Sequence, residues 1–458
     1  MKSELRISQS ISSAILSEVF ESSLDRSWPE YVRGVSLDSR TLQKGDLFFA
    51  IEGQRDGHDF VKNAKAKGAC GAVVARKIEC DLPQILVQNP LKALSDLANW
   101  HRRSWGKEII AITGSSGKTT CKEMMGYMLG DRTWMSKGSW NNHLGVPLTL
   151  LGLEDHHDAA VIEMGMNHSG EIKALTKIAQ PNYGMITNVG RAHIEFFSSV
   201  EKIASAKQEL FDGLGESDTA IIRLDDPWIR NMKDHLSCKV FTVSQKEKAD
   251  LYVTSKIQEE GATQITLQTA NESRNFLINK EEQYEIDNFI ACVALWISIK
   301  KTIMSLPEKI FFPAVSQRFE VFHHSLGFTY IDDCYNANPD SVRASLTKLK
   351  HMEAKRRIFV FGDMGELGSS AAMEHEKLAE ELQDYRIDRV FFAGKFNKDF
   401  YESAVHAGFD AQSIFSFEDK DEMMPILLNQ IQKGDVILVK ASSTMAYSSV
   451  ITQIREIK

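Results

Sequence analysis

The sequence of 458 residues contains only six cysteines, and none of them forms a CxxC pair. At this low content a disulfide framework is not expected, and neither a zinc knuckle nor a thioredoxin-type motif is indicated. No apolar run reaches about 18 residues, so no membrane span is expected. The N-terminal stretch MKSELRISQSISSAILSEVF carries charges and serines throughout, and we therefore expect no signal peptide.

An excess of positive charge is also missing. The 54 Lys and Arg residues are outnumbered by 62 Asp and Glu residues, which gives a net charge of -8. This balance argues against a general electrostatic grip on nucleic acid, although a local basic pocket for an anionic small molecule is compatible with it. We expect a cytoplasmic globular protein; the sequence is silent on oligomeric state, and a monomer is the working expectation.

Continuous apolar runs alternate with helical patterns, which is typical of α/β folds with parallel sheets covered on both faces. The runs at 108–113, 159–165 and 183–190 are predicted to be buried strands that end in polar or glycine residues. Between 249 and 279, polar and apolar residues alternate as they do in half-exposed antiparallel strands.

The last part of the chain repeats the alternation of strand and helix. This pattern predicts a doubly wound parallel sheet, in which residues just after the strands face a ligand. Its strands are expected at 328–332, 357–361, 389–393 and 435–440. At roughly 150 residues per domain the chain is expected to form about three domains. Their predicted boundaries are 1–88, 89–312 and 313–458.

The sharpest local motif is GSSGKTT, between the predicted strand at 108–113 and a helix predicted from about Lys118 to Leu129. Glycines let the backbone turn tightly and point N–H groups inward, and the helix N-terminus adds partial positive charge. Lys118 can reach β- and γ-phosphates, and the hydroxyl of Thr119 can bind Mg²⁺. The motif predicts ATP binding by Gly114, Ser115, Ser116, Gly117, Lys118, Thr119 and Thr120.

The general phosphate-loop pattern has glycine where this chain has Ile112. The alternative is therefore a glycine-rich turn with an incidental Gly-Lys-Thr. The strand before the motif and the helix after it favour phosphate binding.

The variant loop TGSSGKTT resembles that of the Mur ligases, the ATP-dependent amide ligases of peptidoglycan precursor assembly. Further segments resemble motifs of this family in the same order along nearly the whole chain. They are SLDSRTLQKGDLFFAIEGQRDGHDF (36–60), NNHLGVPLTLL (141–151), VIEMGMNHSGEI (161–172), ITNVGRAHIEFF (186–197), SAKQELF (205–211), RFEVF (318–322), IDDCYNANPDSV (331–342) and FGDMGELG (361–368). The stretch IDDCYNANPDS is characteristic of the branch that adds D-Ala-D-Ala, and the DNPR motif of the diaminopimelate- or lysine-adding branch is absent.

The resemblance implies three domains: a UDP-substrate domain, a central P-loop ATPase domain, and a Rossmann-like domain that carries the incoming amino compound. It implies that ATP, with Mg²⁺, phosphorylates the terminal carboxylate of UDP-MurNAc-tripeptide. The amine of D-Ala-D-Ala then attacks the acyl phosphate and gives an amide, ADP and phosphate. The third residue of the tripeptide cannot be read from the chain.

An anionic carboxylate that attacks an anionic triphosphate needs metal ions and fixed positive charge. Besides Lys118, the candidates are Thr119, Glu163 and His193. Glu163 ends one predicted strand and His193 follows another, so both can reach the same sheet edge. Oxygen ligands suit Mg²⁺, whereas the histidine is proposed only from the resemblance. On spacing alone, Glu163 is equally a helix-capping or salt-bridged acid, and His193 a loop histidine bonded to backbone.

Two residues near the end of a predicted helix carry separate expectations. From the residues alone, Lys207 is a solvated lysine. The resemblance implies instead that Lys207 is carbamylated by CO₂ and that the resulting anion helps to hold a second Mg²⁺. Glu209 is expected to pair with a surface lysine.

The resemblance also implies ligand contacts. Asn288, at the start of an apolar helix, is expected to contact adenine, with a simple N-cap as the alternative. Arg318 is expected to reach the ATP phosphates. Asp332 or Asp333 is expected near the ribose or phosphates, and we carry Asp333 forward, although strand alternation does not choose between them. Substrate contacts are expected from Asp38, Ser39, Arg40, Asn142, Asn336 and Asn338.

Three sites depart from the family pattern. Gln317 replaces a common glycine before RFE, Tyr284 replaces a histidine, and VKASSTM (439–445) stands where VKGSRSM is usual. These changes leave the phosphate and metal motifs intact. Three alternatives are weighed against this reaction: another acid–amino-acid ligase (of the tripeptide-forming Mur or folylpolyglutamate synthase type), a P-loop regulator or transporter ATPase, and a non-catalytic nucleotide-binding scaffold.

Overall fold

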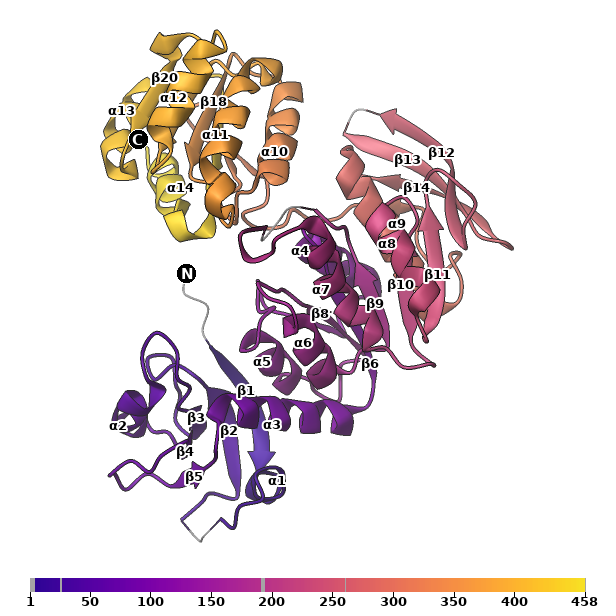
Figure 1. Cartoon of the computed structure of the whole chain (residues 1–458), viewed down its shortest axis with the longest axis vertical. Coiled ribbons are helices and arrows are strands. Elements are labelled where there is room, and N and C mark those ends of the chain that lie inside the picture. Colours follow the sequence, from indigo (N-terminus) through magenta and orange to yellow (C-terminus); the bar gives the residue numbers. More distant parts are fainter. Residues whose placement is uncertain (1–4, 25–26, 191–193, 260, 458) are drawn as a thin grey trace. The chain divides into compact units, whose positions relative to one another are not determined.

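The computed structural model describes residues 5–24, 27–190, 194–259 and 261–457 (Figure 1). Its contacts divide the chain into two compact units. One unit comprises residues 1–189 and 201–310, and the other comprises 190–200 and 311–458. Within the described residues, no helix combines the length and apolar character needed to cross a membrane. The first unit contains two sheets and the second contains one, so the expected three-domain α/β fold class is confirmed.

The N-terminal sheet has the strand order β1-β2-β3-β4-β5. β1 and β2 are antiparallel, and the remaining neighbours are parallel. Helix α2 connects the buried strands β3 and β4. The bounds are β1 Arg6–Ser12, α1 Ser13–Val19, β2 Tyr31–Ser36, β3 Asp46–Phe49, α2 Val61–Ala66, β4 Gly71–Val74 and β5 Gln84–Leu86.

Helix α3 (Pro90–Trp105) connects this sheet to the central one. The side chain of Asn89 accepts from the first-turn N–H groups, a proline follows it, and Gly106 ends the helix at φ 68°. α3 packs on β3 and β4 as well as on helices of the central sheet. The two sheets of the first unit therefore share one buried helix.

The central sheet has the order β15-β14-β13-β12-β11-β10-β9-β6-β8-β7. Strands from β7 to β12 are parallel, while β12, β13 and β14 are antiparallel, as the alternating pattern predicted. The bounds are β6 Glu108–Thr113, β7 Thr133–Met135, β8 Ala159–Glu163, β9 Tyr183–Ile186, β10 Thr219–Arg223, β11 Lys239–Ser244, β12 Leu251–Glu259, β13 Ala262–Gln268, β14 Ser273–Ile278 and β15 Lys309–Ile310.

The chain runs outward from β6 to β7 and returns from β8 past β6 to β9. Since such crossovers are right-handed, helices α4 and α6 cover opposite faces of the sheet. The loop after β6 lies where the winding direction reverses, which is where α/β sheets bind ligands. The helices are α4 Lys118–Leu129, α5 Gly145–Leu151, α6 Glu171–Ala179, α7 Val200–Asp212, α8 Pro227–Met232 and α9 Gln283–Lys300.

The second unit contains the predicted doubly wound sheet, with the order β16-β17-β21-β18-β19-β20. Only the edge strand β16 is antiparallel to its neighbour. The strands are β16 Glu320–His323, β17 Thr329–Asp332, β18 Arg356–Gly362, β19 Arg389–Ala393, β20 Ile414–Phe417 and β21 Asp435–Lys440. The helices are α10 Pro339–His351, α11 Ala371–Glu380, α12 Asn397–His406, α13 Lys420–Gln430 and α14 Ser448–Arg455.

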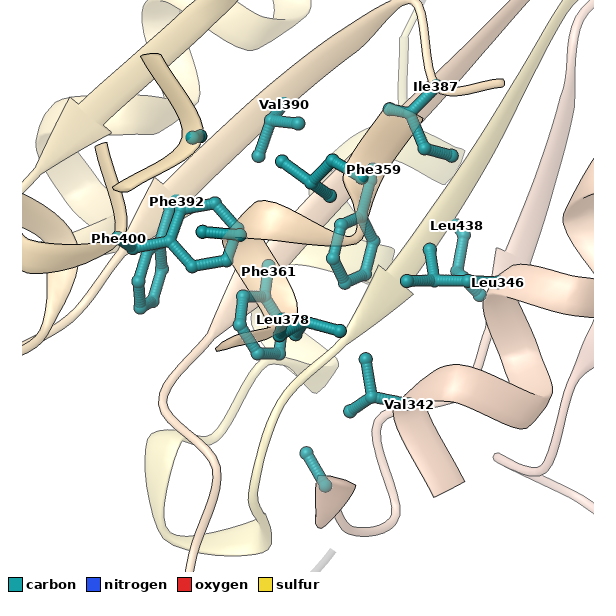
Figure 2. Packing of buried hydrophobic residues seen from close by; sticks show 14 of the residues in the cluster. Val342, Leu346, Phe359, Phe361, Leu378, Ile387, Val390, Phe392, Phe400 and Leu438 are labelled. Atoms are coloured by element: carbon teal, nitrogen blue, oxygen red, sulfur yellow. The ribbon is translucent and has the colours of Figure 1, made fainter. Parts of the chain in front are cut away.

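Alternate residues of β18 build two separate cores, because successive side chains of a strand point to opposite faces. Phe359 and Phe361 pack under α10, α11 and α12, in a cluster with Phe392 and Phe400 (Figure 2). Ile358 belongs to the second core, under α13 and α14. The strand is therefore apolar on both faces from Ile358 to Phe361, as expected for a sheet covered on both faces. The domain boundaries at residues 88 and 312 stay predictions.

We expect Phe361→Ala to destabilise the second unit by about 3–5 kcal/mol, since the fully buried ring contacts three other phenylalanine rings of the cluster. In calorimetric melting of the full chain, the transition of the second unit should move to a lower temperature than in the parent protein. Met373→Ala, on the exposed surface of α11, is the control and should leave the melting temperatures of both units unchanged. An unchanged melting profile for Phe361→Ala would contradict the packing.

Candidate functional site

The loop at residues 114–117 joins the end of β6 to the start of α4, as the motif predicted. A Cβ atom at Gly114 would lie 1.8 Å from Oγ1 of Thr187. Gly117 has φ +78°, and a Cβ atom there would lie 2.8 Å from Nδ2 of Asn288. Neither position has room for a side chain, so the glycines let the backbone pass close to both neighbours.

Asn188, the second residue after β9, fixes the shape of this loop. The N–H of Ser115 donates to the carbonyl of Asn188 (3.1 Å), and the N–H of Ser116 donates to Oδ1 of Asn188 (3.0 Å). Nδ2 of Asn188 donates back to the hydroxyl of Ser116 (2.8 Å), and Nζ of Lys118 donates to the carbonyl of Gly114 (2.7 Å). Sequence reasoning missed Asn188, although a polar residue close to the end of a buried strand was the available signal.

Glu163 is the last residue of β8 and is almost fully buried. Its Oε2 accepts from the hydroxyl of Thr119 (2.8 Å), and its Oε1 accepts from Nδ2 of Asn141 (2.8 Å). Because Glu163 ends a strand, the helix-capping alternative is wrong. The structure thus brings two of the predicted metal-binding oxygens together beside the loop.

Lys207 lies on α7 with 1% of its surface exposed. Burial lowers the pKa of its amine well below the usual value, and the charge of Lys118 lowers it further. The alternative of a solvated surface lysine is therefore wrong. The surface pairing expected for Glu209 is wrong too, because its carboxylate accepts from the N–H groups of Gly170 and Lys173 at the start of α6. His193 lies outside the described residues.

A cleft of about 660 Å³ opens beside the loop, lined by Ser116 and Asn188 on one side and by the first turns of α9 on the other. Asn288 lines it and is 3% exposed. Since α9 begins at Gln283, the N-cap alternative for Asn288 is wrong. Tyr284, one of the departures from the family pattern, also lines this cleft.

One wall of the cleft is held by a partly buried ion pair that sequence reasoning missed. Nη2 of Arg223, at the end of β10, lies 2.8 Å from Oδ2 of Asp287 on α9. Arg223 also donates to the carbonyl of Thr187, directly before the residue that holds the loop. The same strand ends therefore support both the cleft and the loop.

In the second unit, Asp333 follows β17. Its Oδ2 accepts from Nζ of Lys440 (2.7 Å) and from the hydroxyl of Ser345. Asp332 accepts from the N–H of Cys334, and burial raises its pKa. The guanidinium of Arg318 lies 4.0 Å from the ring centre of Tyr335. The predicted nucleotide contacts of Arg318 and Asp333 stay predictions.

Two predicted substrate residues of this unit have local structural roles. The side chain of Asn338 accepts from the N–H of Ser341 in a capping box at the start of α10. Oδ1 of Asn336 accepts from the N–H of Ala337. Both residues shape the loop at the carboxyl end of β17, and their substrate contacts stay predictions.

The predicted substrate residues of the first unit also lie in turns. Arg40 donates to the carboxylate of Asp38, which lowers the pKa of Asp38, while Ser39 between them is buried. Asn142 accepts from the N–H groups of Leu144 and Gly145 at the start of α5. The substrate contacts of these four residues stay predictions.

Family models match most of the chain. They are the Mur ligase family catalytic domain at 31–102, the Mur ligase middle domain at 112–296, and the Mur ligase glutamate ligase domain at 317–443. The UDP-N-acetylmuramoyl-tripeptide–D-alanyl-D-alanine ligase of Escherichia coli is 35% identical over 431 residues, which covers 92% of this chain and 93% of that protein. This chain belongs to the Mur ligase family.

Other relatives agree with this assignment. The Bacillus subtilis enzyme of the same name is 31% identical over 93% of this chain and 95% of its own. A crystal structure of MurF from Acinetobacter baumannii matches with a TM-score of 0.86 at 28% identity, covering 98% of this chain and 99% of that one. MurF from Thermotoga maritima in complex with ADP matches with a TM-score of 0.76 at 27% identity, over 92% and 97% of the two chains. The Mur ligase is therefore an ATP-dependent ligase, and the regulator, transporter and scaffold alternatives are wrong.

We expect Gly114→Ala to weaken ADP binding at least about tenfold, because the added methyl group would collide with Thr187 and displace the loop amides. Titration calorimetry with ADP measures this change. Gly53→Ala is the matched control, since a Cβ atom at Gly53 meets only one backbone atom at 4.0 Å. Equal ADP affinities for the two variants would contradict the steric argument.

Proposed function

We propose that this Mur ligase uses ATP to join D-Ala-D-Ala to UDP-MurNAc-tripeptide in the cytoplasm, where ATP is supplied. The observation that carries the proposal is the buried Thr119–Glu163 pair beside the glycine-lined loop at the N-terminus of α4. This arrangement suits a reaction that brings two anions together. Relatives at 30–35% identity over most of their length carry the name of this reaction. The segment IDDCYNANPDS, at the end of β17, supports the same amino substrate.

The reaction has two steps. An oxygen of the tripeptide's terminal carboxylate attacks the γ-phosphorus of ATP, and ADP leaves. The amine nitrogen of D-Ala-D-Ala then attacks the carbonyl carbon of the acyl phosphate, loses a proton, and expels inorganic phosphate. In the first step negative charge concentrates at the γ-phosphate, so stabilisation by fixed donors is the main contribution of the protein.

The phosphate side of this chemistry belongs to the loop. Its backbone N–H groups and the N-terminus of α4 attract phosphate oxygens. Lys118, whose Nζ now lies on the carbonyl of Gly114, can turn toward the β- and γ-phosphates. The neighbouring cleft, with Asn288 on its wall, has the position and size for the nucleoside.

The residues present fit a magnesium ion. Thr119 offers a hydroxyl oxygen and Glu163 a carboxylate oxygen, both of the hard type that Mg²⁺ prefers, and they lie 2.8 Å apart. When bound, the ion would neutralise charge on the phosphates. Asn141 holds the second oxygen of Glu163, so the carboxylate is oriented before any ligand arrives.

We propose that Lys207 is carbamylated. A buried amine beside Lys118 is costly to charge, so its neutral, nucleophilic form is favoured near neutral pH. The nitrogen attacks CO₂, loses a proton, and becomes a carbamate anion. The charge of Lys118 would then stabilise this anion instead of opposing a second cation.

The folylpolyglutamate synthase alternative has weaker support. The enzyme from Mycobacterium tuberculosis matches with a TM-score of 0.60, but at 14% identity this likeness shows the fold alone. The choice of amino substrate therefore rests on the full-length relatives.

We expect phosphate release to require both acceptor substrates. With ATP and UDP-MurNAc-tripeptide, D-Ala-D-Ala should raise the rate at least about tenfold, since the acyl phosphate needs an amine to react further. A coupled assay for phosphate measures the rate, with single amino acids in place of D-Ala-D-Ala as controls. Equal turnover with L-glutamate would favour the folylpolyglutamate-type alternative.

We expect activity to depend on CO₂. Depletion of CO₂ should lower the turnover of the unmodified enzyme, and bicarbonate should restore it. Lys207→Met should be inactive with or without bicarbonate, because its side chain cannot form a carbamate. NMR with ¹³C-labelled bicarbonate should show a carbamate signal that is missing in Lys207→Met. A fully active enzyme with no such signal would refute the modification.

A further inference from the structure

A second buried lysine follows the loop by one helical turn and has no role in the reaction described so far. Lys122 lies on α4 with 1% of its side chain exposed. Its ammonium group lies 2.8 Å from the carbonyl of Ser136, 2.9 Å from that of Gly138 and 3.0 Å from a carboxylate oxygen of Glu123. These three acceptors match the three N–H bonds of an ammonium group.

The two carbonyls that Lys122 binds belong to the segment at residues 136–141, between β7 and α5. This segment makes two contacts with the end of β8. The hydroxyl of Ser136 accepts from the N–H of Glu163 (3.1 Å), and the side chain of Asn141 donates to Oε1 of Glu163. The carbonyl of Asn141 also accepts from the N–H of Gly165 (2.7 Å). The segment therefore contacts both the backbone and the side chain of Glu163.

α4 thus reaches Glu163 by two routes. The direct route is the hydroxyl of Thr119, and the indirect route runs from Lys122 through the 136–141 segment to Asn141. Both oxygens of the carboxylate are fixed by groups anchored on the same helix. We propose that Lys122 is a positioning residue that sets the orientation of Glu163 for metal binding by bracing this segment against α4.

A lysine at position 122 can do what a neutral donor there could not. Burying a charge costs free energy unless strong partners surround it, and two backbone carbonyls alone would suit a neutral donor. A compact ammonium group can pull both carbonyls toward one point, which a planar amide of shorter reach cannot do. Gly138, at φ +51°, gives the segment the turn that this requires.

The inference rests on the proposed role of Glu163 as a metal ligand. Measurements of magnesium-linked nucleotide binding test the role of Glu163 and the role of Lys122 separately. Titration calorimetry compares ADP with MgADP, and the ratio of the two affinities is the magnesium-linked gain. Lys122→Met should reduce this gain at least about tenfold, within the range found when residues that orient metal ligands are lost. Its affinity for ADP in EDTA should stay within about twofold of the parent, because the loop amides are untouched.

Lys137→Met is the matched control, since it removes an exposed lysine from the same segment without a contact to Glu163. It should keep the parent's gain. Lys122→Gln retains hydrogen-bond donors and should fall between the parent and Lys122→Met, which covers the case in which Lys122→Met does not fold. A folded Lys122→Met or Lys122→Gln with the parent's gain would overturn the inference.

The variant Glu163→Gln distinguishes a failure of the inference for Lys122 from a failure of the proposed metal role of Glu163. If Glu163→Gln loses the gain and Lys122→Met keeps it, the bracing role of Lys122 is wrong while Glu163 remains the metal ligand. If Glu163→Gln keeps the full gain, the proposed metal role of Glu163 is wrong, and the inference for Lys122 is overturned with it.

Discussion

The hydrogen bond between the hydroxyl of Thr119 and the buried carboxylate of Glu163 is the contact on which the site depends. It joins the first turn of the helix after the phosphate loop to the last residue of a neighbouring strand. A carboxylate removed from water must be compensated by donors or by a cation. The hydroxyl and the amide of Asn141 supply donors, while leaving the anionic charge available to a metal ion. The two groups that directly contact the carboxylate are thus neutral.

The winding of the central sheet explains why these groups meet. The loop follows β6, Glu163 ends the adjacent strand β8, and Asn188 follows β9 on the other side of β6. Parallel neighbours end at the same edge of a sheet, so three segments far apart in sequence deliver polar groups to one place. The packed strands therefore hold the site rigid, since each polar group is within two residues of a buried apolar run.

Much of this could be predicted from the sequence. Continuous apolar runs predicted the strands of both doubly wound sheets, and the glycines with Lys118 and Thr119 predicted the phosphate loop. Long-range burial could not be predicted: the residues alone indicated a solvated lysine at 207, and no pattern singled out Lys122, because a helical pattern does not show which neighbour covers a polar face. The partners of Glu163 and Glu209 were equally hidden, since a hydrogen bond between distant segments leaves no periodic signal in either one. The roles of Asn338 and Asn142 at helix starts are local, so their spacing to the following helix was an available signal, although only substrate contacts were predicted for them.

The segment at 190–200 belongs to the second unit although it interrupts the first. Its short helix η2 (Ile194–Phe196) lies against η4 (Gly368–Ser370), and a Cβ atom at Gly368 would lie 3.0 Å from Cγ of Glu195. The backbone therefore passes between the units three times instead of once. A protease that cuts near residue 310 would leave residues 190–200 on the fragment of the first unit, and a gene fragment that starts at 311 would encode the second unit without this segment.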